Sequence, residues 1–463
     1  LTVMLGMSES LRENPDARAR EAGRLVERNG QDLLRLVNQL LDLSKIESGA
    51  LHLHPIRADV MKFVQIAAES FDSLAVMKNQ QLNTRSLITH LVCSKCNATC
   101  SHQIVQTFSS CCNVPLSAVY HLKNQTIDSI HTTEYTMWRY QFVLPVIDPA
   151  NIVSLNEGFT PISQLKKLAD QLSIDTLYLK DEAVNPTGSF KARGLSMGVS
   201  KAKELGIKQM VIPTAGNAGG AMSAYCAKAG IEATVIMPKH TADNLKEACR
   251  LYGDNLIQID GLIDACGKKA REIAASTGAF DMSTMKEPYR LEGKKTLGYE
   301  IAEQFNWDLP DIIIYPAGGG TGLIGIWKAF KELIEMKAIK GALPKMVLVQ
   351  SVECSPMVHL FNDGQLPEHY APKSSAALGL AVPYPFATAM MLAVLKESNG
   401  IALTITEKEM EDGVEEIAKV EGLLLSPEGS ATYIAAEKLL KTGWAKPSER
   451  ILLVNTGSWY KYR

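Results

Sequence analysis

A lysine in a loop of small residues is the strongest candidate for a nucleophile in this sequence. The stretch NPTGSFKARG at 185–194 places Lys191 between the apolar run TLYLK and a helix-like segment. A lysine in this setting is either a solvated surface charge or an amine that condenses with a carbonyl group. The loops that the fold brings beside it decide between the two.

A glycine-rich loop could bind a phosphate group. PAGGGTGLIG follows the apolar run DIIIYP and leads into a helix. Free backbone N–H groups and the positive end of the helix would both face an anion there. The loop has no lysine followed by Ser or Thr, so it is not a nucleotide-binding P-loop. The glycines concerned are Gly318, Gly319, Gly320 and Gly322.

The same loop has two other interpretations. One is a structural tight turn. The other is a dinucleotide site, because Gly320, Gly322 and Gly325 match G-x-G-x-x-G. Glu353 would then hold a ribose, although it lies somewhat beyond the usual spacing of about 20 residues.

Two more loops carry polar side chains after apolar runs. Asn217, in PTAGNAGG, could donate to a phenolic oxygen, and Thr456, in VNTGSWYKY, could meet a pyridine nitrogen. Taken singly, Asn217 is a plausible helix cap and Thr456 a plausible turn residue. Together with Lys191 and the glycine loop, they meet the requirements of pyridoxal phosphate (PLP), whose aldehyde needs an amine and whose phosphate needs N–H donors.

The elements that must position these loops form a regular α/β region from about residue 125. Short apolar runs alternate with amphipathic helices, which predicts parallel strands buried on both faces, with ligands bound at their carboxyl ends. The expected strands are 176–180, 209–213, 232–238, 255–260, 311–316, 345–352 and 450–457.

Six motifs in order make the region from about 88 to 463 resemble the threonine synthase family. These are NPTGSFKARG, TAGNAGG, KEPYRLEGKKTLGYEIAEQ, PAGGGTGLIG, SPEGSA and NTGSWYKY. The resemblance implies an α/β fold, the PLP-dependent fold type II of tryptophan synthase β. It would have two parallel-sheet domains in 126–463, the smaller at about 200–290.

The resemblance also implies roles for individual residues. Lys191 would be the Schiff-base lysine and proton shuttle, Asn217 would contact the PLP phenolic oxygen, and Thr456 its pyridine nitrogen. Arg290 would bind the phosphate of O-phospho-L-homoserine, with a surface salt bridge as the alternative, and Thr214 is a second candidate for substrate binding. The PLP phosphate would be held by Gly318, Gly319, Gly320, Thr321 and Gly322.

The implied reaction is that of a lyase which makes threonine and phosphate. Lys191 would remove the α proton, phosphate would leave from the γ carbon and water would add at the β carbon. Ala218 stands where many threonine synthases have threonine, and Trp459 and Tyr460 stand where smaller residues are usual and could reshape the pocket. Serine or threonine deamination and a cysteate-synthase-like replacement therefore remain alternatives.

A cysteine-rich segment at 86–125 predicts a small ribbon. Cys93 and Cys96 have the C-x2-C spacing of a zinc knuckle. The second pair, Cys111 and Cys112, is adjacent, and adjacent side chains do not readily converge on one ion. Two further candidates for the fourth ligand are Cys100 and His102. The alternative is a ribbon without metal.

Residues 1–85 predict a helical hairpin of a different style. Leu33, Leu36, Leu40 and Leu43 recur at three- and four-residue steps. Residues 1–82 resemble the dimerisation helices of a sensor histidine kinase, without its ATP-binding motifs. This region would be a dimerising pair of helices, an inert fusion partner or, in the non-enzymatic alternative, a signalling module.

The composition limits the partners. The chain has 463 residues and a formal net charge of -2, and we find no membrane-spanning run or signal peptide. Five of the nine cysteines crowd into the ribbon, which favours metal binding in a reducing compartment over disulfides. We expect a cytoplasmic homodimer that acts on a small molecule, with no nucleic-acid or membrane partner.

Overall fold

The computed structural model describes residues 86–261 and 263–462. Contacts divide the chain into two units, Leu1–Leu82 and Asn83–Arg463, and the hairpin expected at 1–85 lies outside the described residues. Within those residues, no helix is both long enough and apolar enough to cross a membrane.

The larger sheet has six strands in the order β12-β11-β10-β13-β5-β4. They are β4 (Ile162–Gln164), β5 (Leu177–Asp181), β10 (Ile312–Pro316), β11 (Lys345–Ser351), β12 (Ile401–Ile405) and β13 (Ile451–Asn455). All pairs are parallel except that of β4 with β5. The apolar runs do not predict β4 and β12, because these edge strands are only partly buried and their pattern is weaker.

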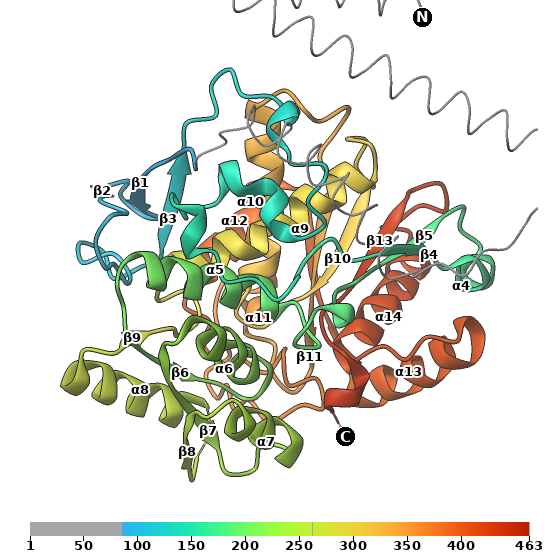
Figure 1. The fold of residues 1–463 in the computed structure, drawn as a ribbon. Helices are drawn as coiled ribbons and strands as arrows, with labels where there is room; N and C mark the ends of the chain where they lie inside the picture. Colours follow the sequence, from blue (N-terminus) through green and yellow to red (C-terminus); the bar gives the residue numbers. More distant parts are fainter. Residues whose placement is uncertain (1–85, 262, 463) are drawn as a thin grey trace, which may run out of the picture. The chain divides into compact units, whose positions relative to one another are not determined.

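Alternate residues of the central strands enter two separate cores. Ile312 and Ile314 of β10 pack in one cluster and Ile313 and Tyr315 in the other, as the two-residue period of a strand requires. One face is covered by α4 (Lys166–Leu172), α13 (Glu407–Glu421) and α14 (Pro427–Lys441), and the other by α5 (Lys191–Glu204), α9 (Tyr289–Gln304), α10 (Thr321–Glu335), α11 (Pro356–Asn362) and α12 (Thr388–Glu397) (Figure 1).

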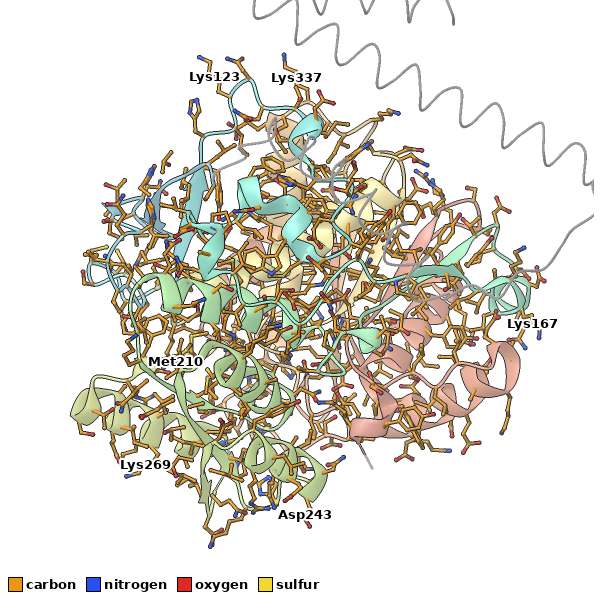
Figure 2. The ribbon with its side chains drawn as sticks, in the orientation of Figure 1. Lys123, Lys167, Met210, Asp243, Lys269 and Lys337 are labelled. Carbon is orange, nitrogen blue, oxygen red and sulfur yellow. The ribbon has the colours of Figure 1, made fainter. Side chains whose placement is uncertain are left out.

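A smaller, all-parallel sheet has the order β8-β7-β6-β9. Its strands are β6 (Gln209–Pro213), β7 (Glu232–Pro238), β8 (Asn255–Ile259) and β9 (Phe280–Asp281), and its helices are α6 (Asn217–Ala229), α7 (Asp243–Leu251) and α8 (Ile263–Thr277). Met210 of β6 is buried, whereas Asp243 and Lys269 lie on the outside of this lobe (Figure 2). Helix α5 packs against both α6 and α9, so it links the small lobe to the large sheet.

The cysteine-rich segment forms a third, antiparallel sheet in the order β2-β1-β3. Its strands are β1 (Ile88–Cys93), β2 (Thr99–Cys100) and β3 (Leu116–Tyr120). The hydroxyl of Tyr120 donates to Glu292 of α9 at 2.9 Å, and the ammonium of Lys328 in α10 donates to the carbonyl of Ala118 at 2.6 Å. The ribbon is therefore anchored to the helices that carry the glycine loop and Arg290.

Candidate active site

A cavity of about 450 Å³ lies where the carboxyl ends of strands from both parallel sheets approach each other. The loop after β6 brings Thr214 and Asn217 to it, and the loop after β13 brings Thr456. Lys191 enters as the first residue of α5, and Arg290 enters from the first turn of α9. The glycine loop after β10 completes the lining with Gly318, Gly319, Gly320, Thr321 and Gly322. The structure thus places every residue predicted to bind cofactor or substrate at one cavity.

Lys191 is positioned by the pairing of two loops that are far apart in the sequence. The N–H of Phe190 donates to the carbonyl of Thr456 at 3.0 Å, and the N–H of Ser458 donates to the carbonyl of Gly188 at 2.9 Å. The Lys191 ammonium lies 4.0 Å from the centre of the Phe190 ring. Burial, and after it the nearby Arg290 guanidinium, lower the pKa of Lys191 to about 7. The amine is thus available in its neutral, nucleophilic form near neutral pH.

A buried ionic network fixes the first turn of α5. Arg193 donates to Glu182, which follows β5, at 2.6 Å and to Glu300 of α9 at 2.6 Å. Lys180 also pairs with Glu300, at 2.9 Å, and all four side chains are fully buried. Although burial raises the pKa of Glu300, Arg193 and Lys180 lower it to about 2. This network holds Lys191 in register with the large sheet, and the sequence motifs do not predict it.

The glycine loop leaves backbone donors free. Among the hydrogen bonds of the described residues, none uses the N–H groups of Gly318, Gly319 or Gly320. Gly320 has a φ of +76° and precedes α10, and a side chain there would overlap Met391. The free N–H groups and the N-terminus of α10 suit a phosphate.

Lys294 is a cavity residue that the motif reasoning missed. Its ammonium donates to the hydroxyl of Thr321 at 2.6 Å and lies 4.2 Å from the centre of the Phe190 ring. Burial, followed by Lys191 and Arg290, holds the pKa of Lys294 well below its usual value. The sequence does contain a signal for this position, because residues four apart on a helix share a face and Lys294 follows Arg290 by four.

Arg290 is buried, with 1% of its surface exposed, so the alternative of a surface salt bridge is wrong. One of its terminal nitrogens donates to the carbonyl of Met282. Its Nε has no hydrogen-bond partner among the described residues. An unsatisfied buried guanidinium beside a cavity is costly unless an anion binds it.

Asn217 and Thr214 differ in which of their polar atoms are already hydrogen-bonded. The Asn217 amide donates to the hydroxyl of Tyr462 at 3.4 Å, and its buried Oδ1 has no partner among the described residues. The Thr214 hydroxyl oxygen accepts the N–H groups of Gly216 at 3.0 Å and Gly219 at 3.3 Å. Thr214 therefore caps the start of α6, which leaves only its O–H for a ligand.

Within the C-terminal segment, the aromatic residue that lines the cavity is not one of the two expected. Tyr460 is 71% exposed, and neither it nor Trp459 belongs to the lining, so the expectation that they reshape the pocket is wrong. The chain turns at this point through a short 3-10 helix, η5 (Trp459–Lys461). It is Tyr462 that lines the cavity, and its hydroxyl donates to Glu428 at 2.7 Å.

The lining as a whole fits PLP. It offers a lysine whose amine is partly neutral near pH 7 and N–H donors at a helix start. Asn217 Oδ1, Arg290 Nε and Glu428 Oε2 are buried there without a partner among the described residues. The dinucleotide interpretation lacks its acidic residue, because Glu353 pairs with Lys373 at 3.4 Å and lies outside the cavity lining.

The predicted metal ligands lie in the ribbon and not at the cavity. The sulfur atoms of Cys93, Cys96, Cys111 and Cys112 all lie within 4.8 Å of one another. Cys100 and His102, the other candidates for a ligand position, are not members of this group.

Comparisons with known proteins agree with this geometry. A family model described as pyridoxal-phosphate dependent enzyme matches residues 153–457. The threonine synthase of Methanocaldococcus jannaschii is 32% identical over 80% of this chain and 92% of its own length, and that of Methanosarcina acetivorans is 32% identical over the same shares. A threonine synthase of Mycobacterium tuberculosis is 30% identical over 70% of this chain and 87% of its own.

Solved structures show the same fold in enzymes of other names. The processed threonine deaminase isoform 2 from Solanum lycopersicum has a TM-score of 0.55 and 22% identity, covering 67% of this chain and 86% of that one. Maize serine racemase has a TM-score of 0.55 and 20% identity, covering 65% and 89%. At these identities the likeness establishes fold type II alone.

A second family model matches the N-terminal region. It is described as the His Kinase A (phospho-acceptor) domain and matches residues 1–49, which confirms the resemblance over a shorter stretch than the expected 1–82. The larger match, together with the threonine synthase relatives, settles the family of the rest. The chain belongs to the pyridoxal-phosphate dependent enzymes and, among them, to the threonine synthase family.

Proposed function

We propose that the protein is a threonine synthase, which converts O-phospho-L-homoserine and water to L-threonine and phosphate with PLP as cofactor. The observation that carries the proposal is the buried Arg290, whose Nε has no partner among the described residues, in the same cavity as Lys191. Such a guanidinium is completed by an anionic group on the substrate, and a planar fork of donors suits phosphate.

A second set of donors in the same cavity would serve the cofactor phosphate. The N–H groups of Gly318, Gly319 and Gly320 have no acceptor among the described residues. The Lys294 ammonium donates to the hydroxyl of Thr321, which leaves the Thr321 O–H for a phosphate oxygen. The cavity thus offers two sets of donors to anions, one at the glycine loop and one at Arg290. A second set of donors beside that for the cofactor supports a substrate that carries its own phosphate.

Bound PLP would supply an aldehyde that forms a Schiff base with amines and a ring that acidifies the α carbon of the attached amino acid. Lys191 holds the amine that accepts the α proton, and a pKa of about 7 lets it both take and return a proton near neutral pH. Asn217 Nδ2 would donate to the phenolic oxygen. The Thr456 hydroxyl, which is neutral, would face the ring nitrogen, and a neutral partner favours elimination and replacement over transamination.

Water exclusion and proton movement depend on the residues around Lys191. Phe190 covers one side of the lysine, with the two ammonium groups of Lys191 and Lys294 at 4.0 and 4.2 Å from its ring centre. Arg290 would orient the phosphate so that it can leave from the γ carbon. Ala218 also lines the cavity, and its small side chain leaves space for the attacking water.

Three broader statements belong to the same proposal. The chain would comprise a helical hairpin at 1–85, the ribbon at 86–125 and the catalytic region at 126–463. It would act as a homodimer, which the match to histidine kinase helices supports. It would be cytoplasmic, which is supported by nine cysteines that form no disulfide in the structure. Sedimentation of the full chain would test the dimer.

The deciding experiment follows both products. Purified protein with PLP is given O-phospho-L-homoserine, and threonine and phosphate are measured together. We expect equal release of both, a loss of about 10⁴-fold in Lys191→Ala, and a raised KM for O-phospho-L-homoserine in Arg290→Ala. Lys269→Ala, at a partly exposed position outside the cavity lining, serves as the control. Ammonia release from serine or threonine, with no threonine formed from phosphohomoserine, would instead support the deaminase alternative.

A further inference from the structure

The first loop of the ribbon has the geometry of a metal-binding knuckle. Between β1 and β2, the N–H of Asn97 donates to the carbonyl of Cys93 at 3.0 Å, and the N–H of Cys93 donates to the carbonyl of Ala98 at 2.9 Å. Asn97 has a left-handed φ of 59°, which asparagine tolerates better than most residues. The turn brings the side chains of Cys93 and Cys96 to the same side.

A second loop repeats this geometry with one change. The N–H of Asn113 donates to the carbonyl of Ser109 at 2.9 Å, the N–H of Ser109 donates to the carbonyl of Val114 at 2.9 Å, and Asn113 has a φ of 56°. Ser109 thus occupies the place that Cys93 holds in the first loop, and Cys112 the place of Cys96. The second knuckle has a hydroxyl where a regular pair of knuckles has its fourth thiol.

Cys111 supplies the thiol that Ser109 lacks. Its sulfur lies 3.5 Å from that of Cys96, and the Cys93 sulfur lies 3.4 Å from the Ser109 hydroxyl. All four sulfur atoms lie within 4.8 Å of one another. The adjacent cysteines therefore converge here, against the expectation from their spacing. Cys112 occupies the knuckle position, and Cys111 replaces the thiol that is missing at Ser109.

We propose that Cys93, Cys96, Cys111 and Cys112 bind one Zn²⁺ as a structural site. Zn–S bonds of about 2.3 Å place sulfur atoms roughly 3.8 Å apart in a tetrahedron, which small side-chain shifts would reach. A disulfide needs about 2.05 Å, and all four cysteines are free. Four protein ligands leave no open position for a substrate.

The ion would join the two loops of a sheet whose strands pack on the main core through residues such as Leu91 and Leu116. Strand β2 has two residues, while Cys96 and Cys111 are exposed, so the loops are not closed by a hydrophobic core. The ribbon meets the catalytic region through the contacts of Tyr120 with Glu292 and of Ala118 with Lys328, and through its buried strand residues. Zinc binding would therefore contribute to folding of the ribbon and leave the chemistry at Lys191 unchanged.

The test measures metal in the full-length holoenzyme. We expect one zinc per chain by elemental mass spectrometry, and a thiolate-to-metal absorption band after exchange for Co²⁺. Cys111→Ser should lose the metal, whereas Cys100→Ser, from β2 beside the cluster, should retain it. Absence of zinc and of the Co²⁺ band from the wild-type protein, or a Cys96–Cys111 disulfide in freshly purified reduced protein, would overturn the proposal.

A rescue variant separates ligand loss from misfolding. The double variant Ser109→Cys with Cys111→Ser restores the regular thiol pattern in the second knuckle, so we expect it to regain one zinc per chain. Failure of this variant to bind metal while it keeps wild-type catalytic activity would contradict the assigned equivalence of Ser109 and Cys93. Titration of the wild-type protein with a mercurial reagent needs no variant and should release the metal as four thiols react.

Discussion

The cavity and the ribbon both gather reactive side chains, but they do so by opposite means. In the ribbon, thiols come together within a short stretch of chain and two of them are exposed. In the cavity, contacting residues such as Asn217 and Tyr462 are 245 positions apart, and burial changes the chemistry of Lys191. Local turns present the thiols of the proposed metal site on two neighbouring loops, whereas a nucleophilic lysine depends on burial by distant elements.

The largest expected effect comes from breaking the buried network under the cavity. Arg193→Met leaves the buried Glu182 without its cationic partner and Glu300 with Lys180 alone, and should destabilise the catalytic region by about 3–5 kcal/mol. Urea unfolding followed by tryptophan fluorescence would measure this. Lys419→Ala removes an exposed pair with Glu415 and should leave the curve unchanged. An Arg193→Met protein as stable as wild type would show that the cavity does not depend on the network.

A smaller effect should follow from removing the donor to the glycine loop. Lys294→Met deletes the bond to Thr321 and should weaken PLP binding roughly tenfold, since a hydrogen bond to a charged group contributes about 1.5–3 kcal/mol. Titration of the apoprotein with PLP, followed by absorbance, measures it. Lys331→Ala, on the exposed side of α10 near Glu397, is the control. Equal affinities of the two variants for PLP would show that Lys294 does not contribute to binding of the PLP phosphate.

The buried state of Lys191 also predicts a pH dependence of stability. Its pKa is about 7 in the folded apoprotein against a usual 10.5, so between these values the unfolded chain holds a proton that the folded one has released. Stability therefore rises with pH across this window through Lys191. In Lys191→Met the slope should fall by up to ~1.4 kcal/mol per pH unit. Urea unfolding at pH 7.5, 8.5 and 9.5 tests this, and parallel curves for both proteins would show that the lysine is charged.

The smallest expected effect is on catalysis, and it distinguishes Tyr462, which lines the cavity, from the exposed Tyr460. Tyr462→Phe removes the bond to Glu428 and the partner of Asn217, which should lower kcat/KM a few-fold, consistent with about 1 kcal/mol per hydrogen bond. Tyr460→Ala, two positions away but exposed, should change nothing. The reverse order in steady-state kinetics would restore the original expectation that Tyr460 shapes the pocket.

The sequence by itself determined the type of fold and the identity of the main groups. Apolar runs predicted the central strands, because strands buried on both faces must be continuously apolar. The motifs identified Lys191, Asn217, Thr456 and the glycine loop as site residues. The C-x2-C spacing predicted the first knuckle, because Cys93 and Cys96 lie in one turn of the chain.

Only the tertiary structure decided the environment of those groups. Lys294, Tyr462 and the Arg193 network became visible when distant elements packed together. Burial, which is a property of the assembled core, placed Arg290 inside the protein with its Nε lacking a partner among the described residues. The pairing of Ser109 with Cys93 likewise required the two knuckles to face each other. Residue types fix which reactions are chemically available, and packing fixes which of them the protein can perform.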